Sequence, residues 1–286
     1  MIDSRILHIS APAKINLFLH ITGRRDDGYH NLQTVFQLLD IGDSLVIESN
    51  PGGVITLDGP DLGIADSDNL IVRAAMALKA LPATPDHCGA AIRLEKQLPS
   101  GGGLGGGSSD AASTLLALNA LWGLQLSTAA LQHTGAALGA DVPVFVLGRS
   151  AWAEGIGEQL TPLDLPPAWY LVLKPDCAVN TGEIFSHREL TRDTPPITMH
   201  AFFAGDSRND CEPVVRKLYP EVDSALNWLQ NFGDARLTGT GACVFCRCDT
   251  EAQALRIAGE VPSRWKAWVA AGMNRSSALK DSESVV

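Results

Sequence analysis

The sequence lacks the features that mark several large protein classes. No apolar run among its 286 residues approaches the roughly 20 residues that span a bilayer. Residues 1–7 show no basic flank followed by an apolar stretch, which argues against a signal peptide. We therefore expect a soluble, cytoplasmic protein. Basic residues are in deficit, and the net charge of −10 argues against a general nucleic-acid binder. A small phosphorylated ligand would need only a few local cations.

A zinc-binding pattern is also missing. Cys243 and Cys246 form a C-x-x-C sequence, but no second pair and no histidine pair follows it. On a strand, two residues three positions apart point to opposite faces. We therefore expect both cysteines to be small residues of the core, where free cysteine is common.

Glycine, in contrast, is concentrated in one place. Six glycines lie within residues 101–107, followed by Ser108 and Ser109. Glycine has no Cβ to block a close approach of the backbone, and a helix N-terminus favours negative charge. The preceding residues 90–94 are typical of a strand and the following residues 111–121 of a helix. This context favours a phosphate-binding loop over a flexible Gly/Ser linker.

The loop matches neither of the two common nucleotide motifs. A P-loop ends in Gly-Lys-Ser or Gly-Lys-Thr, and no lysine lies between Lys96 and Lys174. A dinucleotide-binding fold requires an acidic residue about 20 residues further on. Residues 126–136 contain none. The loop therefore indicates phosphate without indicating either fold.

The pattern along the chain predicts an α+β protein with two unequal lobes. Residues 14–22 are expected to form a strand, with Ile15, Leu17, Leu19 and Ile21 on one face and Lys14 and Asn16 on the other. A second strand over 34–47 is expected to break near Gly42. Asp68 is predicted to cap a helix that ends at residue 81. We expect domains at 1–160 and 161–275, followed by a disordered tail at 276–286.

Three segments together resemble the GHMP kinases, namely residues 12–17, 99–112 and 237–243. Longer stretches at 12–25, 27–34, 69–75, 139–145 and 207–212 resemble the branch that phosphorylates the 2-hydroxyl of 4-diphosphocytidyl-2-C-methyl-D-erythritol, on the methylerythritol phosphate route to isoprenoids. The resemblance implies a two-lobed fold with an N-terminal ATP-binding lobe, a C-terminal α/β lobe and the active site in the cleft between them. It also implies ATP and Mg²⁺, and a small-molecule acceptor.

The resemblance makes Lys14 and Asp141 the catalytic residues. Asp141 would accept the proton of the attacking hydroxyl, and the Lys14 ammonium would keep that carboxylate ionised. Asn16 would contact the same ligand, because it shares a strand face with Lys14. The residues alone leave other roles open, since Asp141 precedes a short helix that it could cap and most lysines lie at the surface.

The resemblance also implies a set of ATP-binding residues. Those on the phosphate loop are Pro99, Gly101, Gly102, Gly103, Leu104, Gly105, Gly106, Gly107, Ser108 and Ser109. Asn69 and Lys96 are the candidates for contacts with adenine. The one departure that we note is Asp110, where asparagine is common in the family, although the first turn of a helix favours an acidic side chain.

At the acceptor end, the resemblance implies a cytidine site. Tyr29 would stack on one side of the cytosine ring and Phe185 on the other, while His30 reads its hydrogen-bonding edge. Core packing is the alternative for Phe185, and a plain β-turn is the alternative for residues 239–241. We expect that turn to pack against the first two motifs.

Two other functions compete with this interpretation. One is a different GHMP kinase, such as a homoserine or mevalonate kinase, which would have no use for a cytidine site. The other is a nucleotide-binding protein that no longer catalyses, against which the presence of both Lys14 and Asp141 argues.

Overall fold

The computed structural model describes residues 5–205 and 207–283. Its strands form a sheet in the order β3-β4-β2-β10-β7-β9-β8, with β1 and β5 pairing to β2 and β6 pairing to β5. The strands are β1 (Ile6–Arg24), β2 (His30–Asn50), β3 (Ile55–Asp58), β4 (Gly89–Glu95), β5 (Ala151–Glu154), β6 (Gln159–Pro162), β7 (Trp169–Lys174), β8 (Ala235–Leu237), β9 (Val244–Cys248) and β10 (Lys266–Met273).

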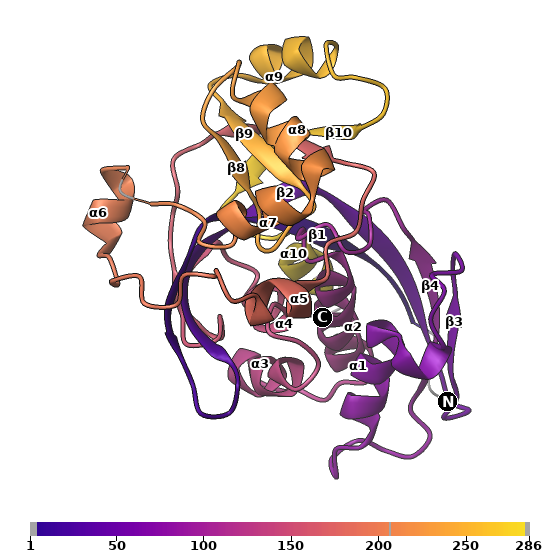
Figure 1. The fold of residues 1–286 in the computed structure, drawn as a ribbon. Coiled ribbons are helices and arrows are strands. Elements are labelled where there is room, and N and C mark those ends of the chain that lie inside the picture. Colours follow the sequence, from indigo (N-terminus) through magenta and orange to yellow (C-terminus); the bar gives the residue numbers. More distant parts are fainter. Residues whose placement is uncertain (1–4, 206, 284–286) are drawn as a thin grey trace.

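Helices lie on this sheet in two groups, and α6 stands apart from both (Figure 1). They are η1 (Asp66–Asp68), α1 (Leu70–Lys79), α2 (Gly106–Leu121), α3 (Thr128–Ala136), α4 (Val142–Leu147), α5 (Thr181–Ser186), α6 (Met199–Phe203), α7 (Glu212–Leu218), α8 (Pro220–Leu229), α9 (Glu251–Ala258) and α10 (Ser277–Glu283). The predicted α+β class is confirmed. Within the described ranges, no helix combines the length and the apolar character needed to cross a membrane.

Each group of helices encloses a hydrophobic core of its own. In the first, buried side chains of α1, α2 and α4 pack on β1, β2 and β4. In the second, α7, α8 and α9 pack on β7 and β9. Strand β10 joins the two lobes, because it pairs with β7 through Ala267 and Leu173 and with β2 through Met273 and Leu38. Cys243 and Cys246 are buried, as predicted for core residues.

Strands β1 and β2 are long, antiparallel and irregular. The predicted break near Gly42 is wrong, because β2 continues through it and only the register shifts, between Pro12 and Lys14. A second shift, between Asn16 and Leu19, ends the simple alternation of faces. The predicted single apolar face therefore divides, and its members join different hydrophobic clusters.

Two further expectations need correction. Asn69, and not Asp68, caps α1, because Asp68 belongs to the preceding 3₁₀ turn and the Asn69 side chain accepts a hydrogen bond from the backbone N–H of Ile71. The tail is not disordered over residues 277–283, which form α10. The backbone N–H and the hydroxyl of Ser10 both donate to Asp281 Oδ2 at 2.9 Å, which holds α10 on β1. Residues 284–286 lie outside the described part.

Candidate active site

A cavity of about 500 Å³ lies between the two lobes. Its walls come from β1, the β1–β2 loop, the glycine run, the start of α4, α5 and the turn before β9. Segments from across the chain therefore meet here, and half of the candidate site residues named from the sequence line the cavity.

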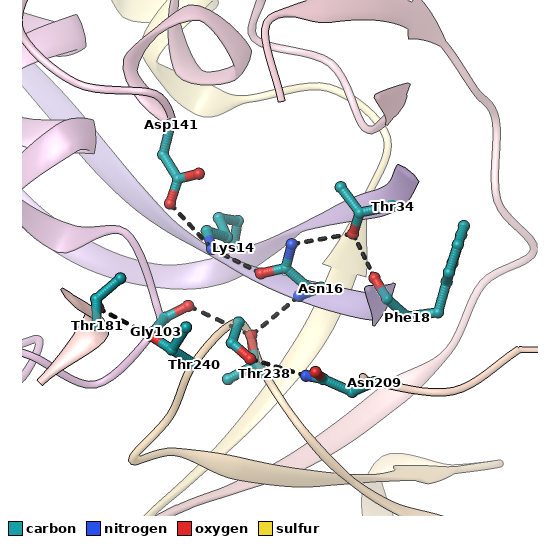
Figure 2. A network of polar contacts seen from close by, with 11 residues as sticks. Lys14, Asn16, Phe18, Thr34, Gly103, Asp141, Thr181, Asn209, Thr238 and Thr240 are labelled. Carbon is teal, nitrogen blue, oxygen red and sulfur yellow. Dashed lines mark hydrogen bonds and ion pairs between the residues drawn. The ribbon is translucent and has the colours of Figure 1, made fainter. Parts of the chain in front are cut away.

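Lys14 lines this cavity, and Figure 2 shows its side chain between Asp141 and Asn16. Its side chain is 3% exposed, and its Nζ lies 3.0 Å from Asp141 Oδ2 and 2.7 Å from Asn16 Oδ1. The ring of Phe36 lies on a further side, with its centroid 5.3 Å from Nζ. The predicted shared face of Lys14 and Asn16 is confirmed, and the ammonium group is held by a carboxylate, an amide oxygen and an aromatic face.

Asp141 occupies the N-cap position of α4, but its side chain makes no capping hydrogen bond to the described residues. The carboxylate turns to Lys14 instead and remains about one-third exposed, at 33%. A purely structural role as a helix cap is therefore wrong for this side chain. A partly exposed carboxylate beside a buried ammonium group can accept a proton from a hydroxyl group bound in the cavity.

The glycine run has the backbone geometry of a cradle. Gly101, Gly103 and Gly105 all have positive φ, at 65°, 75° and 72°. A Cβ at Gly103 would lie 2.4 Å from the backbone oxygen of Thr238, so only glycine fits there. Helix α2 begins at Gly106, five residues earlier than the sequence pattern predicts, and no side chain of the described residues caps it. Its first N–H groups can therefore bind an anion.

The three segments at residues 12–17, 99–112 and 237–243 contact one another through hydrogen bonds that involve the backbone. The N–H of Lys14 donates to the carbonyl of Leu104 at 3.0 Å, and that of Cys243 donates to the carbonyl of Gly102 at 3.0 Å. The Thr238 hydroxyl accepts from the N–H of Asn16 at 3.0 Å and lies 3.3 Å from the carbonyl oxygen of Gly103. The predicted packing of the turn at 239–241 against the first two motifs is confirmed.

The remaining residues of the loop differ in exposure. Gly101, Gly103 and Ser108 line the cavity. Leu104 and Ser109 are buried, and the Ser109 hydroxyl has no hydrogen-bond partner among the described residues.

Tyr29, His30 and Phe185 line the same cavity at its other end. The Tyr29 side chain is 60% exposed, whereas the rings of His30 and Phe185 are stacked, with centroids 5.3 Å apart. Arg192 donates from Nε to His30 Nε2 at 3.1 Å and from Nη2 to the Phe185 carbonyl at 2.9 Å. Burial, with the charges of Arg192 and Arg24, lowers the pKa of His30. A neutral ring that accepts at Nε2 carries its proton on Nδ1.

The two candidates for adenine contacts lie in different surroundings. Asn69 lines a second cavity, of about 280 Å³, together with apolar side chains that include Leu62 and Leu94. Lys96 is instead held between two buried carboxylates, with Nζ 2.6 Å from Asp43 Oδ2 and 2.7 Å from Asp110 Oδ2. Lys96 therefore forms an ion pair with each of two protein side chains, and its contact with adenine stays a prediction.

Asp110 is the departure from the family pattern, and it serves this cluster. Burial raises the pKa of Asp110 to about 7; Lys96 opposes the shift, and the carboxylate of Asp43 adds to it. Burial also acts to lower the pKa of Lys96, but the two carboxylates outweigh it and raise that pKa. The single positive charge of Lys96 is thus shared by two carboxylates next to the first turn of α2.

Sequence reasoning missed several residues around the site. Thr34, Thr238 and Asn209 lie inside the stretches that resemble the family, but the sequence assigned no role to them. In the structure, Asn209 donates to the carbonyls of Leu237 and Gly239 at 2.9 and 2.8 Å. Arg192 lies outside every motif. No signal in a single sequence pointed to it.

With this geometry established, comparisons with known proteins identify the family. The GHMP kinases N terminal domain matches residues 69–149, and the GHMP kinases C terminal domain matches residues 198–267. A homoserine kinase structure from Cytophaga hutchinsonii shares the fold, with a TM-score of 0.69, 17% identity and 96% coverage of each chain. The fold and the site are thus those of a GHMP kinase, a class that uses ATP.

Closer relatives narrow the family. A "4-diphosphocytidyl-2-C-methyl-D-erythritol kinase" of Marinobacter nauticus is 56% identical over 274 residues, which are 94% of this chain and 94% of the relative. The crystal structure of a 4-(cytidine 5'-diphospho)-2C-methyl-D-erythritol kinase matches with a TM-score of 0.80 and 34% identity, and covers 93% of this chain and 99% of that one. This chain belongs to the 4-diphosphocytidyl-2-C-methyl-D-erythritol kinase family.

Proposed function

We propose that this kinase transfers the γ-phosphoryl group of ATP to the 2-hydroxyl of 4-diphosphocytidyl-2-C-methyl-D-erythritol. The products are the 2-phosphate and ADP, on the methylerythritol phosphate route to isoprenoid precursors. One observation carries the proposal: a single cavity contains both the Lys14–Asp141 pair and the aromatic group of Tyr29 and Phe185. A cytidine diphosphate acceptor is long enough to contact the Lys14–Asp141 pair with its hydroxyl group and the aromatic group with its base.

The ATP side of the site uses the backbone. The triphosphate would lie along the glycine run, where the uncapped start of α2 and the positive-φ glycines leave N–H groups free to bind phosphate oxygens. The adenine ring would lie at the second cavity, where the amide group of Asn69 could hydrogen-bond to the edge of the base. Mg²⁺ would enter with the triphosphate, whose oxygens are its usual ligands, and would neutralise charge during transfer.

At the acceptor side, Asp141 aligns the 2-hydroxyl and takes its proton as the oxygen attacks. The new bond forms between that oxygen and the γ-phosphorus, and the bond from the γ-phosphorus to the bridging oxygen of ADP breaks. Lys14 pairs with Asp141 and stabilises negative charge on the reacting oxygens. Asn16 accepts from Lys14 and fixes the direction in which the ammonium points.

At the far end, cytosine would lie against Tyr29 and Phe185. The exposed ring of Tyr29 is free to close over the base. Because Arg192 holds Nε2 of His30, the neutral imidazole ring can offer only Nδ1–H as a donor. This donor matches the edge of cytosine that carries two acceptors, a ring nitrogen and the carbonyl oxygen.

An ADP-release assay coupled to NADH oxidation tests the proposal on a panel of acceptors. We expect turnover of 4-diphosphocytidyl-2-C-methyl-D-erythritol and none of homoserine or mevalonate. Turnover of either small acceptor, without turnover of the cytidyl substrate, contradicts the proposal.

A further inference from the structure

A buried chain of hydrogen bonds stands behind the catalytic pair (Figure 2). It runs from the Phe18 carbonyl to the Thr34 hydroxyl, then to Asn16 and on to Lys14. Thr34 and Asn16 are only 1% and 2% exposed, although both line the cavity. The role of Thr34 in this chain follows from counting protons.

The Thr34 hydroxyl has one proton and the Phe18 carbonyl can only accept, so that proton is committed to Phe18. Toward Asn16, the hydroxyl must therefore act as the acceptor. The Asn16 amide accordingly presents its NH₂ group to Thr34, with Nδ2 3.0 Å from the hydroxyl oxygen. Its oxygen is left facing Lys14 at 2.7 Å.

The opposite orientation of the amide would disable the site. The two ends of an asparagine amide have nearly the same shape, so packing alone selects between them poorly. A flipped amide would turn NH₂ toward the Lys14 ammonium, where two donors would meet at the position now held by a strong charge-assisted bond. Lys14 would then lose one of the two groups that fix the position of its ammonium, which lies 3.0 Å from Asp141.

The irregular pairing of β1 with β2 makes this arrangement possible. The register shift between Asn16 and Leu19 removes Leu17 and Phe18 from the regular ladder. The Phe18 carbonyl can then accept the Thr34 side chain. The Asn16 backbone is anchored separately, because its N–H donates to Thr238. Backbone and amide are thus held by different groups, and Thr34 controls only the amide.

We propose that Thr34 is a positioning residue, whose hydroxyl fixes the Asn16 amide with its oxygen toward Lys14 and so directs the Lys14 ammonium to Asp141 and the acceptor hydroxyl. The proposal rests on the proposed function, since it assigns Thr34 to the transfer step of that reaction. Thr34 lines the same cavity, but in this role it acts through Asn16.

Steady-state kinetics of Thr34→Val, Thr34→Ser and Thr84→Val test the role. Thr34→Val keeps the shape and removes the hydroxyl, so we expect kcat to fall about 10- to 100-fold with the KM for ATP unchanged. Thr34→Ser retains the hydroxyl and should restore kcat. Thr84 is also buried and donates to the Leu78 carbonyl, far from the cavity, so Thr84→Val should lower Tm similarly and leave kcat unchanged.

A double-mutant cycle with Asn16→Ala separates positioning from general destabilisation. If Thr34 acts through Asn16, Thr34→Val has little further effect on kcat once the amide is gone. Where Thr34→Val does not fold, Thr34→Cys keeps the volume, bonds only weakly and should show the same loss.

Three results overturn the proposal: a wild-type kcat for Thr34→Val, no recovery in Thr34→Ser, or additive losses with Asn16→Ala. Failure of the wild-type enzyme to phosphorylate the cytidyl acceptor is a different outcome, which contradicts the proposed function itself.

Discussion

Replacing Asp141 with asparagine removes the proposed base with little change in shape. The carboxylate makes no capping hydrogen bond in α4, so the substitution leaves that helix start intact. An amide oxygen can still accept from Lys14, but it cannot take a proton from the acceptor hydroxyl. General-base catalysis contributes about 10²- to 10⁴-fold, so we expect kcat to fall by that factor, which raises the barrier by about 3–5 kcal/mol.

Stability should respond far less than activity. The Asp141 side chain is one-third exposed, and an ion pair of this kind contributes about 1 kcal/mol, or about 2–4 °C in Tm. ATP binding should stay near normal, because Asp141 lies on the acceptor side. Coupled ADP release gives kcat, calorimetry gives Tm and titration with an ATP analogue gives the Kd.

Asp164→Asn is the matched control, since Asp164 is exposed and pairs with Arg149 away from the cavity. It should leave kcat unchanged. Intact activity in Asp141→Asn, or an equal loss in both variants, refutes the assignment of Asp141.

Three other substitutions give separate expectations. Tyr29→Ala should weaken binding of the acceptor by about 1–3 kcal/mol, because a stacking contact with cytosine is lost. The KM for the acceptor should then rise while the KM for ATP stays unchanged, which kinetics with each substrate varied in turn will measure. The reverse pattern contradicts the cytidine assignment. Arg192→Met removes a positive charge and should raise the pKa of His30, which an NMR titration follows; an unchanged pKa contradicts the contact. Asp110 has a pKa of about 7 folded and an ordinary value of 3.8, so the folded state binds more protons between them and loses stability as pH rises through this window. Calorimetry across it should show Tm falling for the wild type and falling less for Asp110→Asn, whereas parallel profiles contradict this origin.

Local patterns in the sequence were sufficient to predict part of the site. The shared face of Lys14 and Asn16 follows from strand alternation, which holds because β1 is regular across these two residues. The alternation then ends at a register shift after Asn16. Such a shift depends on how two strands pair, which a period of two along one strand does not contain.

The long-range partners could not be predicted in this way. Asp110 looked out of place beside a phosphate loop because its partner, Lys96, comes from the end of β4. His30 and Arg192 are 162 residues apart, and no motif contains the arginine. The sequence pattern predicts too late a start for α2, because glycine disfavours helices. Position 106 needs a small residue for a reason that lies elsewhere in the chain, since a Cβ there would lie only 3.1 Å from Lys96 Nζ.

A crystal structure with an ATP analogue and 4-diphosphocytidyl-2-C-methyl-D-erythritol bound together tests most directly whether one cavity serves both ends of the acceptor. We expect the 2-hydroxyl within hydrogen-bond distance of Asp141, and the cytosine ring between Tyr29 and Phe185. A cytosine ring bound elsewhere, or a 2-hydroxyl remote from both Asp141 and the γ-phosphate, would contradict the proposed function.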